Sequence, residues 1–125
     1  MIDVVVRSGD WERRAFPARD GMRAAVRYTC SCYYIDELGV PVGNLTIRTY
    51  REPEDAPPVH IPPGVYAIAG GMLQVREGRF IVNWDAFINE ISAGRGVSPR
   101  WQWVEDENGA RAVPLSPRIV KSAGK

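Results

Sequence analysis

The stretch AVRYTCSCYYI, residues 25–35, carries the clearest strand pattern in the chain. Apolar or small side chains at positions 26, 28, 30, 32 and 34 alternate with a second set at 27, 29, 31 and 33. Because successive strand side chains point to opposite faces, this alternation predicts a strand with one buried and one solvent-exposed face. NLTIRTY, residues 44–50, alternates in the same way and predicts a second such strand.

Three further strands are expected on either side of this pair. IDVVVR (2–7) and VYAIAGGML (65–73) read as strands, and QVREGRFIVNW (74–84) reads as a turn at Gly78 followed by a strand. The central Gly70-Gly71 pair indicates a bulge or a sharp bend of the kind used at barrel corners. Five strands and no convincing helix before residue 84 predict an all-β fold built on a small closed antiparallel sheet.

The remaining segments are expected to be loops, except for two short elements. Residues 8–22 lack a clean period and predict an exposed loop, and five prolines exclude a regular element in 51–64. WDAFINEI (84–91) has helical spacing, and 101–115 predicts a hairpin around Asn108-Gly109. We therefore expect a barrel over 1–91, followed by a linker and a C-terminal extension over 92–125 with a basic end.

Composition limits the classes of function. The 125-residue chain has a formal net charge of +1, which by itself predicts no polyanionic partner, but fourteen of its sixteen basic residues are arginine. Arginine suits phosphate and stacks on aromatic rings, although the bias can also reflect a GC-rich genome. Neither a secretory signal nor a membrane-length apolar segment is recognisable, so no membrane partner and a reducing cytoplasm are expected.

Catalytic and metal-binding patterns are weak. His60 is the only histidine, and Cys30 and Cys32 are the only cysteines, spaced poorly for chelation or for bridging each other. The chain has no phosphate-binding glycine loop, and its carboxylate pairs fall in predicted turns. We expect no enzyme, cofactor or metal; the rival is an enzyme built around His60 and the acidic loop 51–55.

Arginines interleaved with aromatic residues form the strongest functional pattern. The exposed face of 25–35 carries Arg27 and Tyr33, and that of 44–50 carries Arg48 and Tyr50. The loop before the first of these strands adds Arg13, Arg14, Phe16, Arg19 and Arg23. Arginines neutralise phosphates and aromatic rings stack bases, so the pattern predicts a platform for single-stranded DNA. Solubility alone also explains such arginines, and the alternative function is a small all-β structural or assembly protein that binds no nucleic acid.

Four short motifs occur in a recognisable order. They are Met1-Ile2-x-Val4, Arg19-Asp20-Gly21, the run Cys32-Tyr33-x-x-Asp36-x-x-Gly39, and Pro63-Gly64-Val65-Tyr66 before a strand and a hairpin. In this order they resemble the gene V-type single-stranded DNA-binding (helix-destabilising) proteins of filamentous bacteriophages, over about residues 1–90. The resemblance implies a five-stranded OB-like barrel with protruding hairpin loops, acting as a two-fold homodimer with cooperative dimer–dimer contacts. Such proteins coat single strands without sequence preference during phage DNA replication in the host cytoplasm.

The resemblance also implies positions for the binding residues. A DNA-binding wing matches roughly 13–27 and a hairpin near the dimer axis matches 74–80. Arg19 and Tyr33 fall where the family has binding residues, and Arg76, Arg79 and Phe80 lie in or beside the second hairpin. Met22-Arg23-Ala24-Ala25 replaces the family's Lys-Pro-Tyr-like stretch, so the wing aromatic is Phe16 or is missing. Trp101 and Trp103, with Arg95 and Arg100, either extend the DNA surface or belong to a hairpin packed on the barrel.

Overall fold

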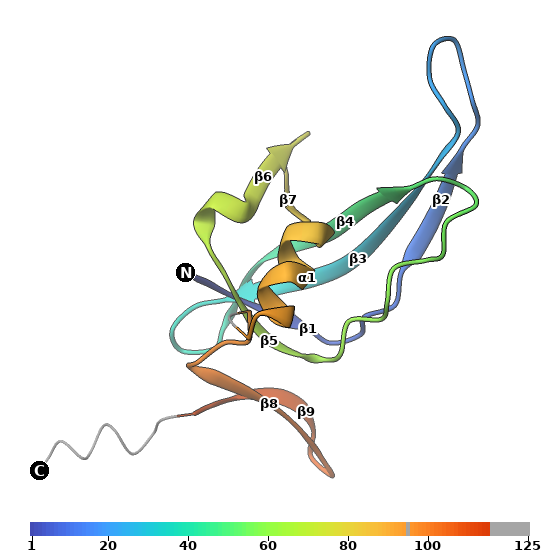
Figure 1. Ribbon diagram of the computed structural model, residues 1–125. Coiled ribbons are helices and arrows are strands. Elements are labelled where there is room, and N and C mark those ends of the chain that lie inside the picture. The colour runs from blue at the N-terminus through green and yellow to red at the C-terminus, as the bar shows by residue number, and fades with distance from the viewer. Residues whose placement is uncertain (95, 116–125) are drawn as a thin grey trace, which may run out of the picture.

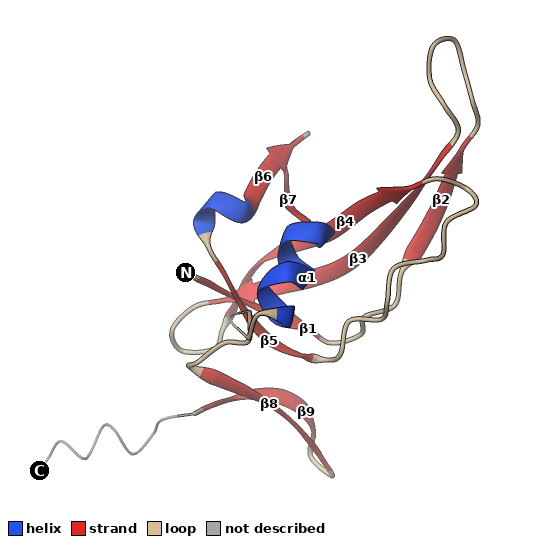
Figure 2. Cartoon of the chain, viewed as in Figure 1, coloured by secondary structure: helices blue, strands red, loops and turns tan. Residues whose placement is uncertain are grey.

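The computed structural model describes residues 1–94 and 96–115, and strands dominate this part of the chain (Figure 2). The strands are β1 (Ile2–Val6), β2 (Glu12–Phe16), β3 (Ala25–Ile35), β4 (Pro41–Arg51), β5 (Gly64–Ile68), β6 (Leu73–Arg76), β7 (Arg79–Asn83), β8 (Trp101–Asp106) and β9 (Gly109–Pro114). A 3₁₀ helix, η1 (Gly70–Met72), and an α-helix, α1 (Trp84–Ser92), interrupt them. The all-β class predicted from the alternating patterns is confirmed.

The hairpin of β3 and β4 is the centre of the fold. Its two strands have 11 residues each and pair antiparallel, with Cys30 opposite Ile47 and Cys32 opposite Leu45. All four side chains are buried in the main core, as the alternation predicts. The other face of the same strands stays open to solvent or half-buried, so the hairpin has one structural face and one available face.

The main sheet runs in the order β5-β1-β3-β4-β7-β6, with β2 paired to the outer part of β3. The two ends of this path, β5 and β6, are consecutive in the chain and are separated only by Ala69 and η1. The predicted bend at Gly70-Gly71 is therefore confirmed, although it is a 3₁₀ turn and not a bulge. The hydrogen-bonded path itself remains open, so a closed sheet of five continuous strands is not confirmed.

One pairing departs from the antiparallel sheet that we expected. β4 and β7 run parallel, with Thr46 beside Ile81, Ile47 beside Val82 and Arg48 beside Asn83. Between them the chain passes through the proline-rich loop, β5, η1 and β6, which is the kind of long crossover that a parallel pair requires. The expectation of an entirely antiparallel sheet is therefore wrong at this position.

The segment predicted as a loop over 8–22 contains a strand. β2 pairs with β3 from Glu12 opposite Thr29 to Phe16 opposite Ala25, and its side chains are almost all exposed. A strand without a buried face has no alternating apolar signal, which is why the pattern alone missed it. β2 and β3 form a hairpin that projects from the body and carries the loop 17–24 at its far end (Figure 1).

The helix α1 covers part of the main core. Asn83 caps its N-terminus by accepting hydrogen bonds from the backbone N–H groups of Asp85 (2.9 Å) and Ala86 (3.2 Å). Trp84 and Phe87 are buried in the cluster that contains the β3 and β4 core residues. The short helix expected over 84–91 is thus confirmed, and its role is to cover apolar side chains. No helix in 1–94 or 96–115 is long and apolar enough to cross a membrane.

The C-terminal hairpin β8–β9 packs on the main sheet at the end opposite the β2–β3 loop (Figure 1). Trp101 is buried against Val5, Ile35 and Val65. Just before it, Ser98 donates its backbone N–H to the Val65 carbonyl at 2.9 Å. Of the two alternatives for the tryptophans, packing of the hairpin against the rest of the fold is therefore the one observed for Trp101.

A buried carboxylate anchors the same segment. Asp3, whose side chain is 7% exposed, accepts hydrogen bonds from Arg100 Nε (2.9 Å), Arg100 Nη2 (2.8 Å) and Ser98 Oγ (2.9 Å). These hydrogen bonds raise the pKa of the Arg100 guanidinium. Arg100 is thus held to Asp3 as part of the fold; Arg95 lies outside the described residues.

Candidate nucleic-acid interface

A row of arginine and aromatic side chains crosses the outer face of β2, β3 and β4. The strand registers place Arg14 opposite Arg27, and Arg27 opposite Tyr50. The next row on this face places Thr29 opposite Arg48. Residues paired across neighbouring strands share a face, so β2 brings Arg14 beside two residues that lie 13 and 36 positions further along the sequence.

The arginines of this face lie over its aromatic rings. The guanidinium carbons of Arg14 and Arg27 are 5.1 Å and 5.3 Å from the centroid of the Phe16 ring. That of Arg48 is 5.3 Å from the centroid of the Tyr50 ring, which is half exposed. The result is a flat surface of alternating π-faces and planar cations, a chemistry that accepts both bases and phosphates. We call these five residues the outer-face cluster.

The arginines of the outer-face cluster form no ion pair within the described residues, although Glu12 stands in the same row as Thr29 and Arg48. Arg14 and Arg27 stand directly opposite each other, an arrangement of like charges that destabilises a sheet. Within the described part of the chain, none of Arg14, Arg27 and Arg48 forms an ion pair, and the Nε of Arg27 is buried without a hydrogen-bond partner. A bound anion would supply both the missing charge and the missing acceptor.

Arg13 does not belong to this cluster. It pairs with Tyr28, whose ring is buried on the core side of β3, so it lies on the opposite side of β2 from Arg14. Grouping both arginines as one binding set ignored the strand alternation that β2 imposes. Arg13 is therefore not expected to contact a strand bound on the outer face.

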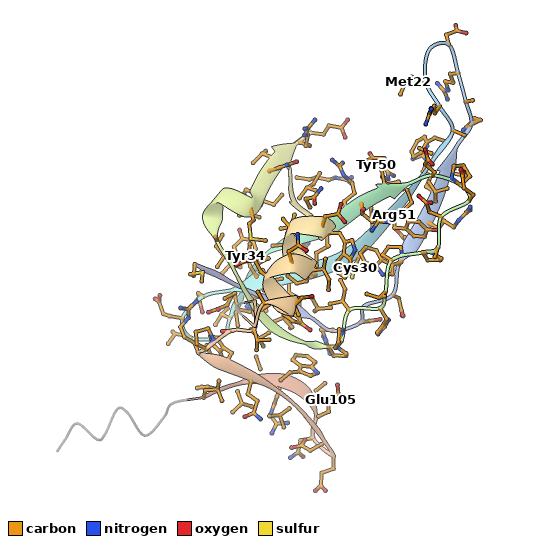
Figure 3. The ribbon with its side chains drawn as sticks, in the orientation of Figure 1. Met22, Cys30, Tyr34, Tyr50, Arg51 and Glu105 are labelled. Carbon is orange, nitrogen blue, oxygen red and sulfur yellow. The ribbon has the colours of Figure 1, made fainter. Side chains whose placement is uncertain are left out.

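A groove adjoins the cluster at the base of the projecting loop. It has a volume of about 510 Å³, and its lining residues are Phe16, Pro17, Arg19, Met22, Arg23, Ala25 and Tyr50. Figure 3 shows Met22 on the loop and Tyr50 at the end of β4. A backbone hydrogen-bonded bridge between Arg19 and Met22 closes the loop around Gly21, which has a positive φ of 70°. Sequence reasoning missed Pro17 and Met22; an exposed methionine beside an Arg-x-Gly turn was the available signal.

An acidic turn lies beside the groove. Glu52 Oε1 is 3.2 Å from Arg23 Nη1, and both side chains are largely exposed. Asp55 Oδ2 accepts the backbone N–H of Glu52 at 3.1 Å, which holds the turn in place. Arg51 is engaged separately, with Asp85 (3.4 Å) and Thr49 (2.9 Å). Glu52 is therefore an internal competitor for a phosphate at Arg23.

Tyr33 lies at the far end of the same outer face. It pairs with Asn44 and lines a hollow of about 370 Å³ together with Arg7. Six residues of strand separate it from Arg27, which is roughly 20 Å at the usual strand rise. Tyr33 and the outer-face cluster are thus too far apart to form one contact site. They lie on the same face of β3, so an extended ligand could reach both.

The β6–β7 hairpin stands near this second end. Arg76 and Arg79 pair across its turn, where Glu77 (φ 54°) and Gly78 (φ 76°) are both left-handed. The ring of Phe80 meets that of Tyr34 edge-on at 6.1 Å and is 40% exposed. Gly78 suits this turn, as expected, whereas neither arginine forms an ion pair within the described residues.

The two cysteines are buried, whereas His60 is exposed. Burial raises the pKa of the Cys30 thiol to about 11, with a smaller contribution from the charge of Asp10, and burial raises the pKa of Cys32 further. Both therefore remain neutral thiols at physiological pH. His60 Nδ1 is 3.9 Å from Asp10 on an exposed surface, and no cluster of three potential metal ligands occurs in 1–94 or 96–115.

Neither the protein-family models, nor the curated proteins, nor the solved structures include a match to this chain. Function is therefore inferred from the chemistry of the outer face and from the motif order.

Proposed function

We propose that this chain is a sequence-nonspecific single-stranded DNA-binding protein that coats phage DNA during replication. The observation that carries the proposal is the outer-face cluster, in which unpaired arginines lie over Phe16 and Tyr50. Solubility does not require arginines to face each other, because that arrangement costs stability. A polyanion with exposed bases satisfies every member of the cluster.

The proposed fold is an OB-like barrel of the gene V type. Support comes from the strand path, in which β5 and β6 act as two halves of one strand bent at η1. If β1 and β2 are also counted as one interrupted strand, the proposed barrel has five strands. In chain order they are β1–β2, β3, β4, β5–β6 and β7. The parallel β4–β7 pair then joins the third and fifth of them. OB-folds bind single strands on a sheet face and its adjoining loops, as proposed here.

The proposed mechanism has two stages. The arginines of the outer face capture phosphates and release counterions, which is fast and independent of sequence. Unpaired bases then stack on Tyr50 and Phe16, and further along the face on Tyr33. Duplex DNA is disfavoured because paired and stacked bases do not offer their faces to protein rings.

Self-association completes the proposal. In the gene V-type arrangement, the β6–β7 hairpin lies near a two-fold axis and sends arginines toward the DNA of the partner subunit. The exposed, unpaired Arg76 and Arg79, together with the half-exposed Phe80, suit that position. Cooperative coating in the host cytoplasm would follow from contacts between such dimers.

A salt titration tests the proposal. Affinity for oligo-dT, measured by quenching of tryptophan fluorescence, is expected to fall steeply as salt rises, with a slope of about −0.7 for each phosphate contact. Duplex of the same length is expected to bind more weakly. Absence of oligo-dT binding at low salt would reject the proposal and favour a structural or assembly protein.

Glu52→Gln is expected to tighten oligo-dT binding by up to about fivefold at low salt. The substitution frees Arg23 from an exposed ion pair worth roughly 0.2–1 kcal/mol. The matched control is Glu107→Gln, which removes the same charge at the distant β8–β9 turn. In an Arg23→Gln background the gain should disappear, because the two residues act as one pair. An equal gain from both glutamates would instead indicate an effect of net charge alone.

A further inference from the structure

We propose that the groove between the β2–β3 loop and Tyr50 is a subsite for one unpaired nucleotide of the bound strand. The base enters the apolar groove, and its adjoining phosphate lies between Arg19 and Arg23. This inference rests on the proposed function and deepens it. The β2–β3 loop has no tyrosine after its Arg19-Asp20-Gly21 turn on which a base could stack. The groove would hold the base instead.

The walls of the groove suit a flat aromatic ligand. Five of its seven lining residues are apolar or aromatic, and no carboxylate lines it. Its volume of about 510 Å³ falls within the usual range for small-molecule sites. Met22, which is 69% exposed, supplies a flexible and polarisable wall that adapts to bases of different shape. Such a wall fits binding without sequence preference.

The state of Tyr50 supports the same assignment. Arg48 covers one part of its ring, and the ring also lines the groove while staying half exposed. A base stacked there would lie between an aromatic side chain and the loop, next to the Arg27 side chain that pairs with Tyr50 across the strands. The groove is therefore continuous with the outer-face cluster.

Charge decides between a nucleotide and an apolar protein side chain as the occupant. Two arginines line the groove, and the only ion pair there within the described residues, Arg23 with Glu52, is exposed and inexpensive to break. A methionine or leucine from a partner protein would leave the Arg19 guanidinium without an anion and Arg23 with Glu52 alone. A nucleotide provides a base for the walls and a phosphate for the arginines.

A substitution that fills the groove distinguishes binding of the base from binding of the phosphate. Ala25→Leu adds an apolar side chain inside the groove without changing charge. Oligo-dT affinity is expected to fall about tenfold, the loss of one stacked base, with an unchanged salt slope. Affinity for an abasic deoxyribose-phosphate oligomer should stay as in the wild type. Ala110→Leu, on β9, is the matched control and should change neither affinity.

Each other outcome has a defined meaning. If wild-type protein binds oligo-dT and Ala25→Leu binds it equally well, the subsite is rejected while the proposed function stands. Equal losses on oligo-dT and on the abasic oligomer also reject it. Changed self-association on sedimentation, with DNA affinity intact, makes the groove a protein contact and overturns the inference. If wild-type protein binds no DNA, the proposed function itself fails. Met22→Ser, at an exposed loop position, provides the same measurement should Ala25→Leu not fold.

Discussion

Gly9→Ala is expected to lower the free energy of unfolding by about 3 kcal/mol or more, near the upper end for a substitution that adds one methyl group. A Cβ at this position would lie 2.0 Å from the carbonyl oxygen and 2.6 Å from the nitrogen of Ile61. Ile61 is buried in the core, and its backbone cannot retreat without moving the proline-rich loop. The same loop is held by Trp11, whose Nε1 donates to the Val59 carbonyl at 3.0 Å.

Thermal and urea unfolding of the purified variant measure this effect, which corresponds to a fall in melting temperature of roughly 10 °C. Gly70→Ala is the matched control, since a Cβ there meets nothing within 4 Å and its φ is not positive. It should change stability by less than about 1 kcal/mol in either direction. Similar values for the two variants would mean that the loop does not lie against Gly9 as described.

Replacing the three outer-face arginines together is expected to abolish most binding while leaving the fold intact. In the variant Arg14→Gln, Arg27→Gln, Arg48→Gln, the salt slope for oligo-dT should become shallower by about 2, at roughly 0.7 per phosphate contact. Affinity at low salt should fall on the order of 100-fold. Stability should be unchanged or slightly higher, because the repulsion between Arg14 and Arg27 is removed.

Arg111→Gln is the control, because Arg111 lies on β9 and pairs with Asp106 at 2.9 Å. It should leave the slope unchanged. Arg76→Ala and Arg79→Ala should each make the slope shallower by about 0.7 if their hairpin reaches the DNA of a partner subunit. A triple variant that binds as the wild type does would show that the outer face is a solubility surface and that any binding lies elsewhere.

Much of the fold could be predicted from short-range pattern. β3, β4, the bend at η1, the helix α1 and the β8–β9 hairpin were all readable, because each has its own alternation, helical spacing or turn residues. The strand β2 could not be predicted from the sequence, since its side chains are almost all exposed and show no apolar alternation. The parallel β4–β7 pair could not be predicted either, because pairing between residues 35 positions apart leaves no local mark in the sequence.

The residues of the candidate site also fall into two groups, those predicted from the sequence and those that only the structure brought to the site. Arg27, Tyr33, Arg48 and Tyr50 were predicted because strand alternation places them on the solvent face. The register of β2 against β3 then put Arg14 with them and moved Arg13 away, which depends on hydrogen bonds between distant segments. Met22 and Glu52 became relevant only because the loop folds back toward the end of β4.

By itself, then, the sequence determined which residues face water, since this follows from a period of two along each strand. Only the tertiary structure decided which of them meet: the opposed arginines, the groove beside Tyr50 and the Asp3 anchor that holds Arg100 to the main sheet. The physical reason is that burial is a property of each side chain in its own strand, whereas proximity depends on register and on chain crossings between segments far apart.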